Sequence, residues 1–191
     1  NCIDTFTGWK INGYRFGFNR KTRIMTPIKW LLRNVMTYRR NHMLSQDCID
    51  FSARIYNTLL DTGEWKQAGN INIYKSTGNE VSTEKIILEA DVANKIVYHP
   101  TAEPEDNIIE VDLVIVPGLV FDEKLARYGR GRGYYDRFLC RLPKQTIVIA
   151  VGYDFQVMSH KWRLGLKSHD IKMDCIITEK RVIQKKGTFF Y

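Results

Sequence analysis

Three glycines at alternate positions form the most distinctive chemical pattern in the sequence. Gly129, Gly131 and Gly133 lie in the segment RYGRGRGYYD (residues 127–136), where arginines alternate with them and an aspartate follows. Glycine lets backbone N–H groups approach phosphate oxygens, because no Cβ stands in the way. Arginine adds fixed positive charge and can donate two hydrogen bonds to one phosphate. The segment therefore predicts a binding site for a polyphosphate.

Asp136 ends this segment and would lie beside the bound phosphates. Magnesium prefers carboxylate and phosphate oxygens, so Asp136 is a candidate to hold a magnesium ion there. The glycine spacing differs from that of the dinucleotide fingerprint and from that of the Walker loop. A disordered Gly-Arg stretch that binds RNA is the alternative. We disfavour it because a nearly continuous apolar run (111–116) and an amphipathic helix (134–142) flank the segment.

Lys29 and Arg33 are a second pair of candidate phosphate ligands. Thr26 and Pro27 are typical of a helix start, and the helix is expected to run to about residue 40. Residues four apart project from one face of a helix, so Lys29 and Arg33 form a like-charge pair that an anion between them would stabilise. The apolar residues of this helix predict its buried stripe: Ile28, Leu31, Leu32 and Val35.

Strand and helix patterns alternate along the rest of the chain. Helices are expected between residues 45 and 63, 83 and 94, and 134 and 142. Strands are expected over residues 71–74, 95–98, 111–116, 146–152 and 175–178. Such alternation is typical of a parallel sheet that helices cover on both faces. We therefore predict an α/β fold, a three-layer sandwich with a mostly parallel central sheet flanked by helices.

The excess positive charge gathers in the first forty residues. They contain nine lysines and arginines and one acidic residue, whereas the formal charge of the whole chain is +8. Such a run is more often a solvated face than a contact for nucleic acid or anionic lipid. Within it, Asn12–Gly13 predicts a tight hairpin turn.

Cysteines, histidines and apolar runs exclude several classes of protein. The four cysteines and four histidines are dispersed, which argues against a disulfide framework and against a zinc site. No apolar run reaches the roughly 18 residues of a membrane-spanning helix. We expect a protein of a reducing compartment, cytoplasmic, with a mitochondrial location left open.

The motifs of residues 117–139 resemble those of a known enzyme family. The sequence reads PG-x-x-FD at residues 117–122, and R-x-G-x-G-x-GYYD-x-x-L at residues 127–139. This combination is similar to the signature of the 5-formyltetrahydrofolate cyclo-ligases, also called methenyltetrahydrofolate synthetases. Residues 29–33 are similar to the family's N-terminal K-x-x-L-R. The resemblance spans residues 29–178 and implies a single cyclo-ligase-like α/β domain (26–191) after a basic N-terminal extension (1–25).

The resemblance also implies a reaction, with ATP and magnesium as cofactors. Such an enzyme converts 5-formyltetrahydrofolate to 5,10-methenyltetrahydrofolate through a phosphorylated formyl group. Glu80 matches an acid that contacts folate, and we place Lys75 beside it as a substrate-binding residue. Asp170 falls where the family has a second aspartate near magnesium, which makes Asp136 and Asp170 the expected metal ligands. The expected cofactor-binding residues are Lys29, Arg33, Arg127, Gly129, Arg130, Gly131, Arg132, Gly133, Tyr134 and Tyr135.

The expected catalytic residues are Arg130, Arg132 and Tyr135, because phosphoryl transfer depends mainly on alignment and on neutralising charge. Packing in the core is the alternative for Tyr134 and Tyr135. We expect a monomer whose partners are a folate and ATP, and neither nucleic acid nor a membrane. The alternative function is a non-catalytic relative that binds nucleotide and uses its basic N-terminal segment to bind RNA or a protein.

The connection between residues 100 and 111 is shorter than expected. A parallel crossover with its helix needs at least about ten to twelve residues. Members of the resembled family carry a longer segment here, which contributes to the folate pocket. The two adjoining strands are therefore antiparallel, residues are missing, or the folate pocket is reduced.

Overall fold

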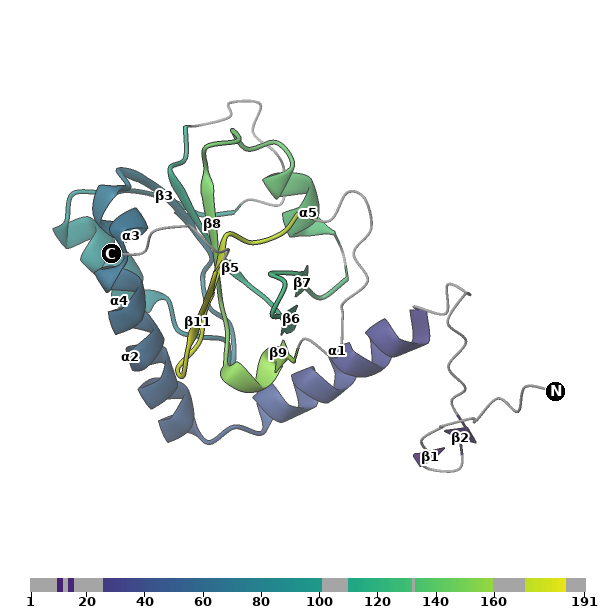
Figure 1. Cartoon of the computed structure of the whole chain (residues 1–191). Coiled ribbons are helices and arrows are strands. Elements are labelled where there is room, and N and C mark those ends of the chain that lie inside the picture. Colours follow the sequence, from purple (N-terminus) through teal and green to yellow (C-terminus); the bar gives the residue numbers. More distant parts are fainter. Residues whose placement is uncertain are drawn as a thin grey trace.

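A six-stranded sheet lies at the centre of the computed structural model (Figure 1). In spatial order its strands are β11 (Val182–Gln184), β10 (Cys175–Ile177), β8 (Ile147–Val151), β5 (Leu113–Pro117), β3 (Asn70–Ile73) and β4 (Ile96–Tyr98). The strands from β10 to β4 are parallel, and β11 runs antiparallel to β10. The structure describes residues 10–11, 14–15, 26–100, 110–131, 133–159 and 171–184.

Different layers cover the two faces of this sheet, as each strand's alternating side chains require. The first face packs against α2 (Ser45–Asp61), α3 (Gly63–Gln67) and α4 (Glu84–Val92). The second face packs against α5 (Tyr134–Leu139) and a small three-stranded sheet. The predicted α/β class with a mostly parallel, covered sheet is therefore confirmed, and strands supply part of the second outer layer.

The small sheet contains much of the PG-x-x-FD motif. Its strands are β7 (Arg127–Tyr128), β6 (Val120–Asp122) and β9 (Val157–Met158), next to the short 3-10 helix η1 (Asp154–Gln156). The ring of Phe121 is fully buried, and a Cβ on Gly118 or Gly152 would run into it. Oδ1 of Asp122 accepts hydrogen bonds from the backbone N–H groups of Lys124 and Ala126. These motif residues therefore hold β6 and β7 against the ends of β5 and β8.

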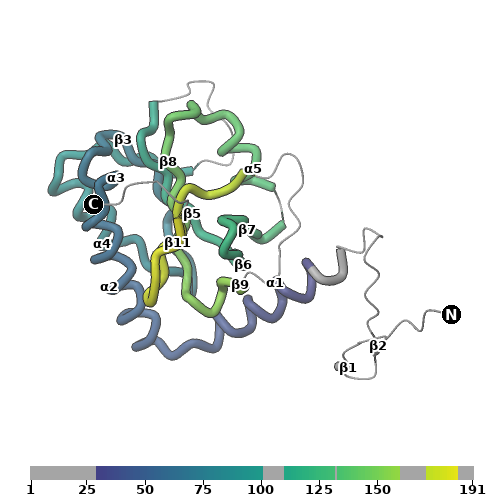
Figure 2. The backbone as a smooth tube through the Cα atoms, viewed as in Figure 1, coloured from purple at the N-terminus to yellow at the C-terminus, as the bar shows by residue number. Residues whose placement is uncertain are grey.

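Helix α1 (Thr26–Asn41) runs beside β6 and leads into α2 (Figure 2). Met36 is buried against the small sheet and Leu32 packs beside it. Leu31 and Val35 are exposed, so the predicted buried stripe is wrong for these two residues; the side chain of Ile28 lies outside the described part. The stripe is rotated because the inward face of α1 also carries basic residues.

The β4–β5 connection joins strands that point in the same direction. Both β4 and β5 pair in parallel with β3, which excludes the antiparallel alternative. Residues 101–109 of the connection lie outside the described part. Of residues 1–25, the structure describes β1 (Lys10–Ile11) and β2 (Tyr14–Arg15), which pair antiparallel as the predicted hairpin requires. None of the described helices is long and apolar enough to cross a membrane.

Candidate functional site

Two loops and one helix meet beyond the carboxyl ends of the parallel strands. The first loop (residues 74–83) follows β3, and the second, the glycine loop (residues 129–133), joins β7 to α5. Helix α1 contributes its inward face. Open α/β sheets bind their ligands at this end, because the loops that follow the strands gather there.

The glycine loop requires glycine for two separate reasons. Gly131 and Gly133 have φ angles of 95° and 64°, in the left-handed region that residues with a Cβ avoid. A Cβ on Gly131 would also lie 3.4 Å from Cζ of Arg33. The bare backbone therefore leaves room for a guanidinium directly over the loop, which is the arrangement that a phosphate cradle needs.

Lys29 and Arg33, two of the four basic residues of α1, approach this loop. Nε of Arg33 donates a hydrogen bond to the carbonyl oxygen of Gly129 at 2.9 Å. Nζ of Lys29 lies 4.4 Å from the ring centroid of Tyr128, immediately before the loop, and Cζ of Arg33 lies 5.8 Å from it. These contacts orient two cationic groups toward the glycines.

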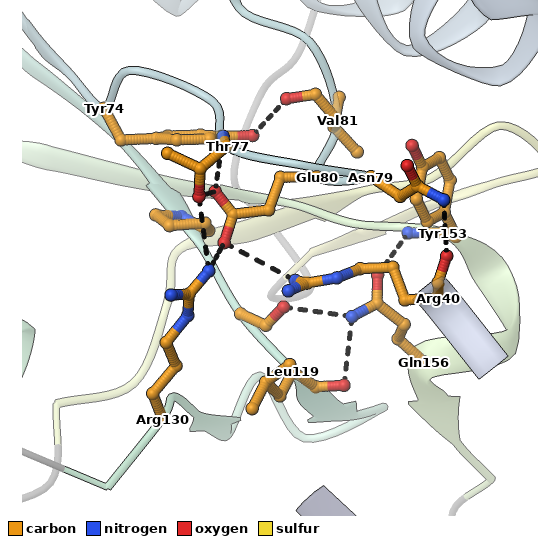
Figure 3. Close-up of polar contacts among 12 residues, drawn as sticks. Arg40, Tyr74, Thr77, Asn79, Glu80, Val81, Leu119, Arg130, Tyr153 and Gln156 are labelled. Carbon is orange, nitrogen blue, oxygen red and sulfur yellow. Dashed lines mark hydrogen bonds and ion pairs between the residues drawn. The ribbon is translucent and has the colours of Figure 1, made fainter. Parts of the chain in front are cut away.

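Glu80 lies at the other side of the site and is bonded to the glycine loop (Figure 3). Oε1 of Glu80 lies 2.8 Å from Nη2 of Arg130. Oε2 accepts hydrogen bonds from the backbone N–H and the hydroxyl of Thr77, at 3.1 and 3.2 Å. The predicted folate contact and a predicted phosphate contact are therefore direct neighbours.

Backbone contacts within the first loop fix the position of Glu80. The hydroxyl of Tyr74 donates to the carbonyl oxygen of Val81 at 2.7 Å (Figure 3). The hydroxyl of Thr83 donates to the backbone carbonyl oxygen of Tyr74 at 2.8 Å. Burial, aided by the nearby carboxylate of Glu80, raises the pKa of Tyr74 well above its ordinary value, so its hydroxyl stays protonated as a donor.

Arg127 connects the glycine loop to the start of α5. Its Nη2 lies 3.4 Å from Oδ1 of Asp136, and its Nη1 donates to the carbonyl oxygen of Pro117 at 3.2 Å. Its guanidinium lies over the ring of Tyr135, 5.0 Å from the centroid. Burial raises the pKa of Tyr135, although Arg127 opposes the shift. Tyr135 packs against the buried apolar residues on both faces of the central sheet and contacts Tyr134 edge-on, which agrees with the core alternative for this residue.

The described residues can supply part of a magnesium site. Asp136 is 29% exposed and retains one carboxylate oxygen beyond its long contact with Arg127. Magnesium in nucleotide sites usually takes one or two carboxylates together with substrate phosphates, so a single aspartate beside the loop fits the ion. Within the described ranges, no group of three or more His, Cys, Asp and Glu side chains forms a metal cluster. Asp170 and Arg132, the other predicted residues, lie outside these ranges.

Lys75 is exposed in the first loop, and none of the described residues makes a polar contact with its ammonium group. The structure therefore brings Glu80 into the site by contact and leaves Lys75 at its edge.

Arg40, near the end of α1, is a site residue that sequence reasoning missed. Its Nη1 lies 3.5 Å from Oε1 of Glu80, and its side chain is largely buried. Burial lowers the pKa of this guanidinium, and the opposing charge of Glu80 limits the shift. Its position, seven residues after Arg33 and thus two helical turns along the same face, is the signal that could have found it.

A buried glutamine supports the strand ends beneath this site. Nε2 of Gln156 donates to the carbonyl oxygens of Gly118 and Leu119, both at 3.0 Å, and Oε1 accepts from the backbone N–H of Tyr153 (Figure 3). The amide thereby satisfies backbone groups that would otherwise be buried without partners.

Comparison with known proteins identifies the family. The model of the 5-formyltetrahydrofolate cyclo-ligase family matches residues 25–110 and 106–179. The chain belongs to this family. The two matched parts overlap at residues 106–110, within the connection that is shorter than expected.

Individual cyclo-ligases and related structures agree with this assignment. A probable 5-formyltetrahydrofolate cyclo-ligase of Schizosaccharomyces pombe is 28% identical over 136 residues, which are 63% of this chain and 66% of the relative. A 5-formyltetrahydrofolate cyclo-ligase of Mycolicibacterium smegmatis is 38% identical over 80 residues, 42% of this chain and 40% of the relative. The structure of Aquifex aeolicus 5,10-methenyltetrahydrofolate synthetase superposes with a TM-score of 0.72 and 25% identity, covering 85% of this chain and 95% of that one.

Proposed function

We propose that this cyclo-ligase family member converts 5-formyltetrahydrofolate and ATP to 5,10-methenyltetrahydrofolate, ADP and phosphate, with magnesium. The observation that carries the proposal is the direct ion pair between Glu80 and Arg130. It joins a loop suited to polyphosphate to an acid suited to the folate, so both substrates would lie within reach of one another. Family membership supports the same reaction.

The chemistry requires alignment more than a protein nucleophile. In the proposed first step, the formyl oxygen attacks the terminal phosphorus of ATP and ADP leaves. N10 of the folate then attacks the activated carbon, the formyl oxygen departs with the phosphate, and N10 loses its proton. Such steps are accelerated mainly by holding the reactants together and by fixed groups that neutralise developing charge.

Different residues of the chain would bind the nucleotide phosphates, the transferred phosphoryl group and the folate. We assign Lys29, Arg33 and Arg127 to the nucleotide phosphates, in line with their contacts at the glycine loop. Arg130, with Arg132, would stabilise the phosphoryl group in transfer, and Glu80 would orient the folate. Tyr135 is better suited to hold Arg127 than to touch the substrates, because its ring lies beneath that guanidinium.

Asp136 would hold the magnesium ion, with Asp170 as a second ligand. When bound, the ion would neutralise charge on the phosphate oxygens. The pair of Asp136 with Arg127 supports this role, because the arginine fixes one carboxylate oxygen and leaves the other to a ligand.

A spectroscopic assay tests the reaction. Purified protein is mixed with magnesium-ATP and 5-formyltetrahydrofolate, and the absorbance of the methenyl product is followed. Product formation that requires both substrates supports the proposal. No product together with tight RNA binding would instead favour the non-catalytic alternative.

We also propose that the chain acts as a monomer in the cytoplasm. Light scattering with size-exclusion chromatography tests the monomeric state.

A further inference from the structure

The carboxylate of Glu80 lies between two arginines that come from different elements (Figure 3). Arg130 of the glycine loop approaches to 2.8 Å, and Arg40 of α1 approaches the same oxygen to 3.5 Å. The side chains differ in exposure, at 61% for Arg130 and 7% for Arg40, while that of Glu80 is 9% exposed. The guanidinium of Arg130 is therefore accessible to a ligand from solvent, whereas that of Arg40 lies inside the protein.

Asn79 ties the backbone of Arg40 to the loop that carries Glu80. Nδ2 of Asn79, the residue before Glu80, donates to the carbonyl oxygen of Arg40 at 3.0 Å and to that of Met43 at 3.5 Å. The end of α1 is thus tied to the loop that carries the acid. Nε of Arg40 is buried, and no described residue accepts a hydrogen bond from it. Burying a charged guanidinium with an unpaired N–H group is unfavourable, and the carboxylate of Glu80 is the main group that compensates it.

We propose that Arg40 is a positioning residue for substrate binding, which holds the carboxylate of Glu80 in place when Arg130 turns to the nucleotide. The inference rests on the proposed function. A phosphate would compete with Glu80 for Arg130, because both are anions and Arg130 is exposed. The nearly buried carboxylate would then lack a counter-charge unless a second cation stayed beside it. Arg40 is that cation, so it preserves the folate contact while the nucleotide is bound.

This role predicts that Arg40 acts through Glu80 and mainly on the binding of the folate. Arg40→Met should weaken binding of 5-formyltetrahydrofolate by about tenfold, the size expected for a hydrogen bond to a charged group. The affinity for magnesium-ATP should fall by a smaller factor, because Arg40 does not touch the glycine loop and is needed there only to support Glu80 when Arg130 turns to the phosphates. Arg40→Lys should recover part of the folate affinity. Glu80→Gln should also lose affinity for 5-formyltetrahydrofolate. Adding Arg40→Met to Glu80→Gln should cause no further loss of that affinity.

Calorimetry on the full chain measures these affinities, with Arg39→Met as the matched control. Arg39 is the exposed neighbour on the same helix, and its guanidinium lies over the ring of Phe155 rather than near Glu80. Melting temperatures show whether each variant folds. The double variant removes both buried charges, so it is expected to fold even if Arg40→Met alone does not.

The outcomes separate this inference from the proposed reaction. Unchanged folate affinity in Arg40→Met, or an equal additional loss in the Glu80→Gln background, would overturn the positioning role while wild-type turnover still supported the reaction. Wild-type protein that binds 5-formyltetrahydrofolate in an Arg40-dependent way without forming product would leave the inference standing and reject the reaction. Wild-type protein that binds no folate overturns both.

Discussion

Glu80 and Arg130 form a 2.8 Å ion pair although fifty residues separate them in the chain. The pair links the loop after β3 to the glycine loop across the site. Arg130 also donates to the hydroxyl of Thr77 at 3.3 Å, so the arginine is held by two groups of the opposite loop. Binding of a phosphate to Arg130 would replace these contacts.

Arg130→Met tests whether this arginine serves the reaction or the fold. We expect kcat/KM to fall by about 100-fold, because removal of one preorganised donor to a developing charge has effects of this size. The free energy of unfolding should change by less than about 1 kcal/mol, because Arg130 is mostly exposed and its ion pair is screened by water. Steady-state kinetics and urea unfolding provide the two values. Arg141→Met, at an exposed position after α5, is the control and should change neither.

Gly131→Ala tests the open backbone of the glycine loop. The left-handed φ of 95° should cost about 1 kcal/mol of stability for a residue with a Cβ. The Cβ would also press on Arg33 at 3.4 Å, so the KM for ATP should rise severalfold. Gly78→Ala is the matched control, because Gly78 has a φ of 57° and nothing within 4 Å of the added atom. It should lose similar stability and keep its KM; an equal rise in KM for both variants contradicts the predicted phosphate cradle.

The sequence was sufficient for five of the six strands of the main sheet, because these are short apolar runs between helical patterns. Each strand predicted in residues 71–178 is present within two residues of its expected bounds. The strands β6, β7 and β9 were not predicted, because two or three residues are too few to show a periodic pattern. β11 was also missed, and it pairs only through a tight return from β10.

The candidate site was partly predictable for a different reason. Local spacing identifies the glycine loop and places Lys29 and Arg33 on one face of α1. Spacing does not reveal contacts between distant segments, so the bond between Glu80 and Arg130 required the fold. The stripe on α1 was placed wrongly because apolar residues were taken to face inward, whereas Arg40 is buried and Val35 is exposed. A helix that lines a site turns polar groups inward.

Cys175 offers a test of burial that does not depend on function. Its side chain is fully buried in β10, and burial, with the nearby carboxylates of Glu64 and Asp174, raises its pKa to about 12. At pH 8 the thiol is therefore protonated and shielded, and a thiol reagent should label exposed Cys140 but not Cys175 until denaturant is added. Peptide mapping by mass spectrometry distinguishes the two.

The same shift predicts how stability depends on alkaline pH. The unfolded thiol ionises near its ordinary pKa of about 8.5, whereas the folded thiol keeps its proton to about pH 12. The unfolded state thus binds fewer protons in this interval, and the contribution of Cys175 to the free energy of unfolding should fall as pH rises. Cys175→Ala removes this titration, and a pH dependence identical to that of the wild type would contradict the raised pKa.

Asp136→Asn tests the proposed magnesium ligand most directly. The amide keeps the shape of the side chain and one oxygen for Arg127, so the melting temperature should stay close to that of the wild type. Asparagine lacks the charge that attracts magnesium, so the magnesium concentration for half-maximal turnover should rise by at least about tenfold. Even residues that only support metal ligands change metal affinity by this factor. Turnover is measured at fixed ATP over a range of magnesium concentrations. Asp91→Asn, at an exposed position in α4, is the matched control for the loss of one acidic charge. If Asp136→Asn and Asp91→Asn gave the same magnesium curve, Asp136 would be a partner of Arg127 alone, and the metal would have to be held elsewhere.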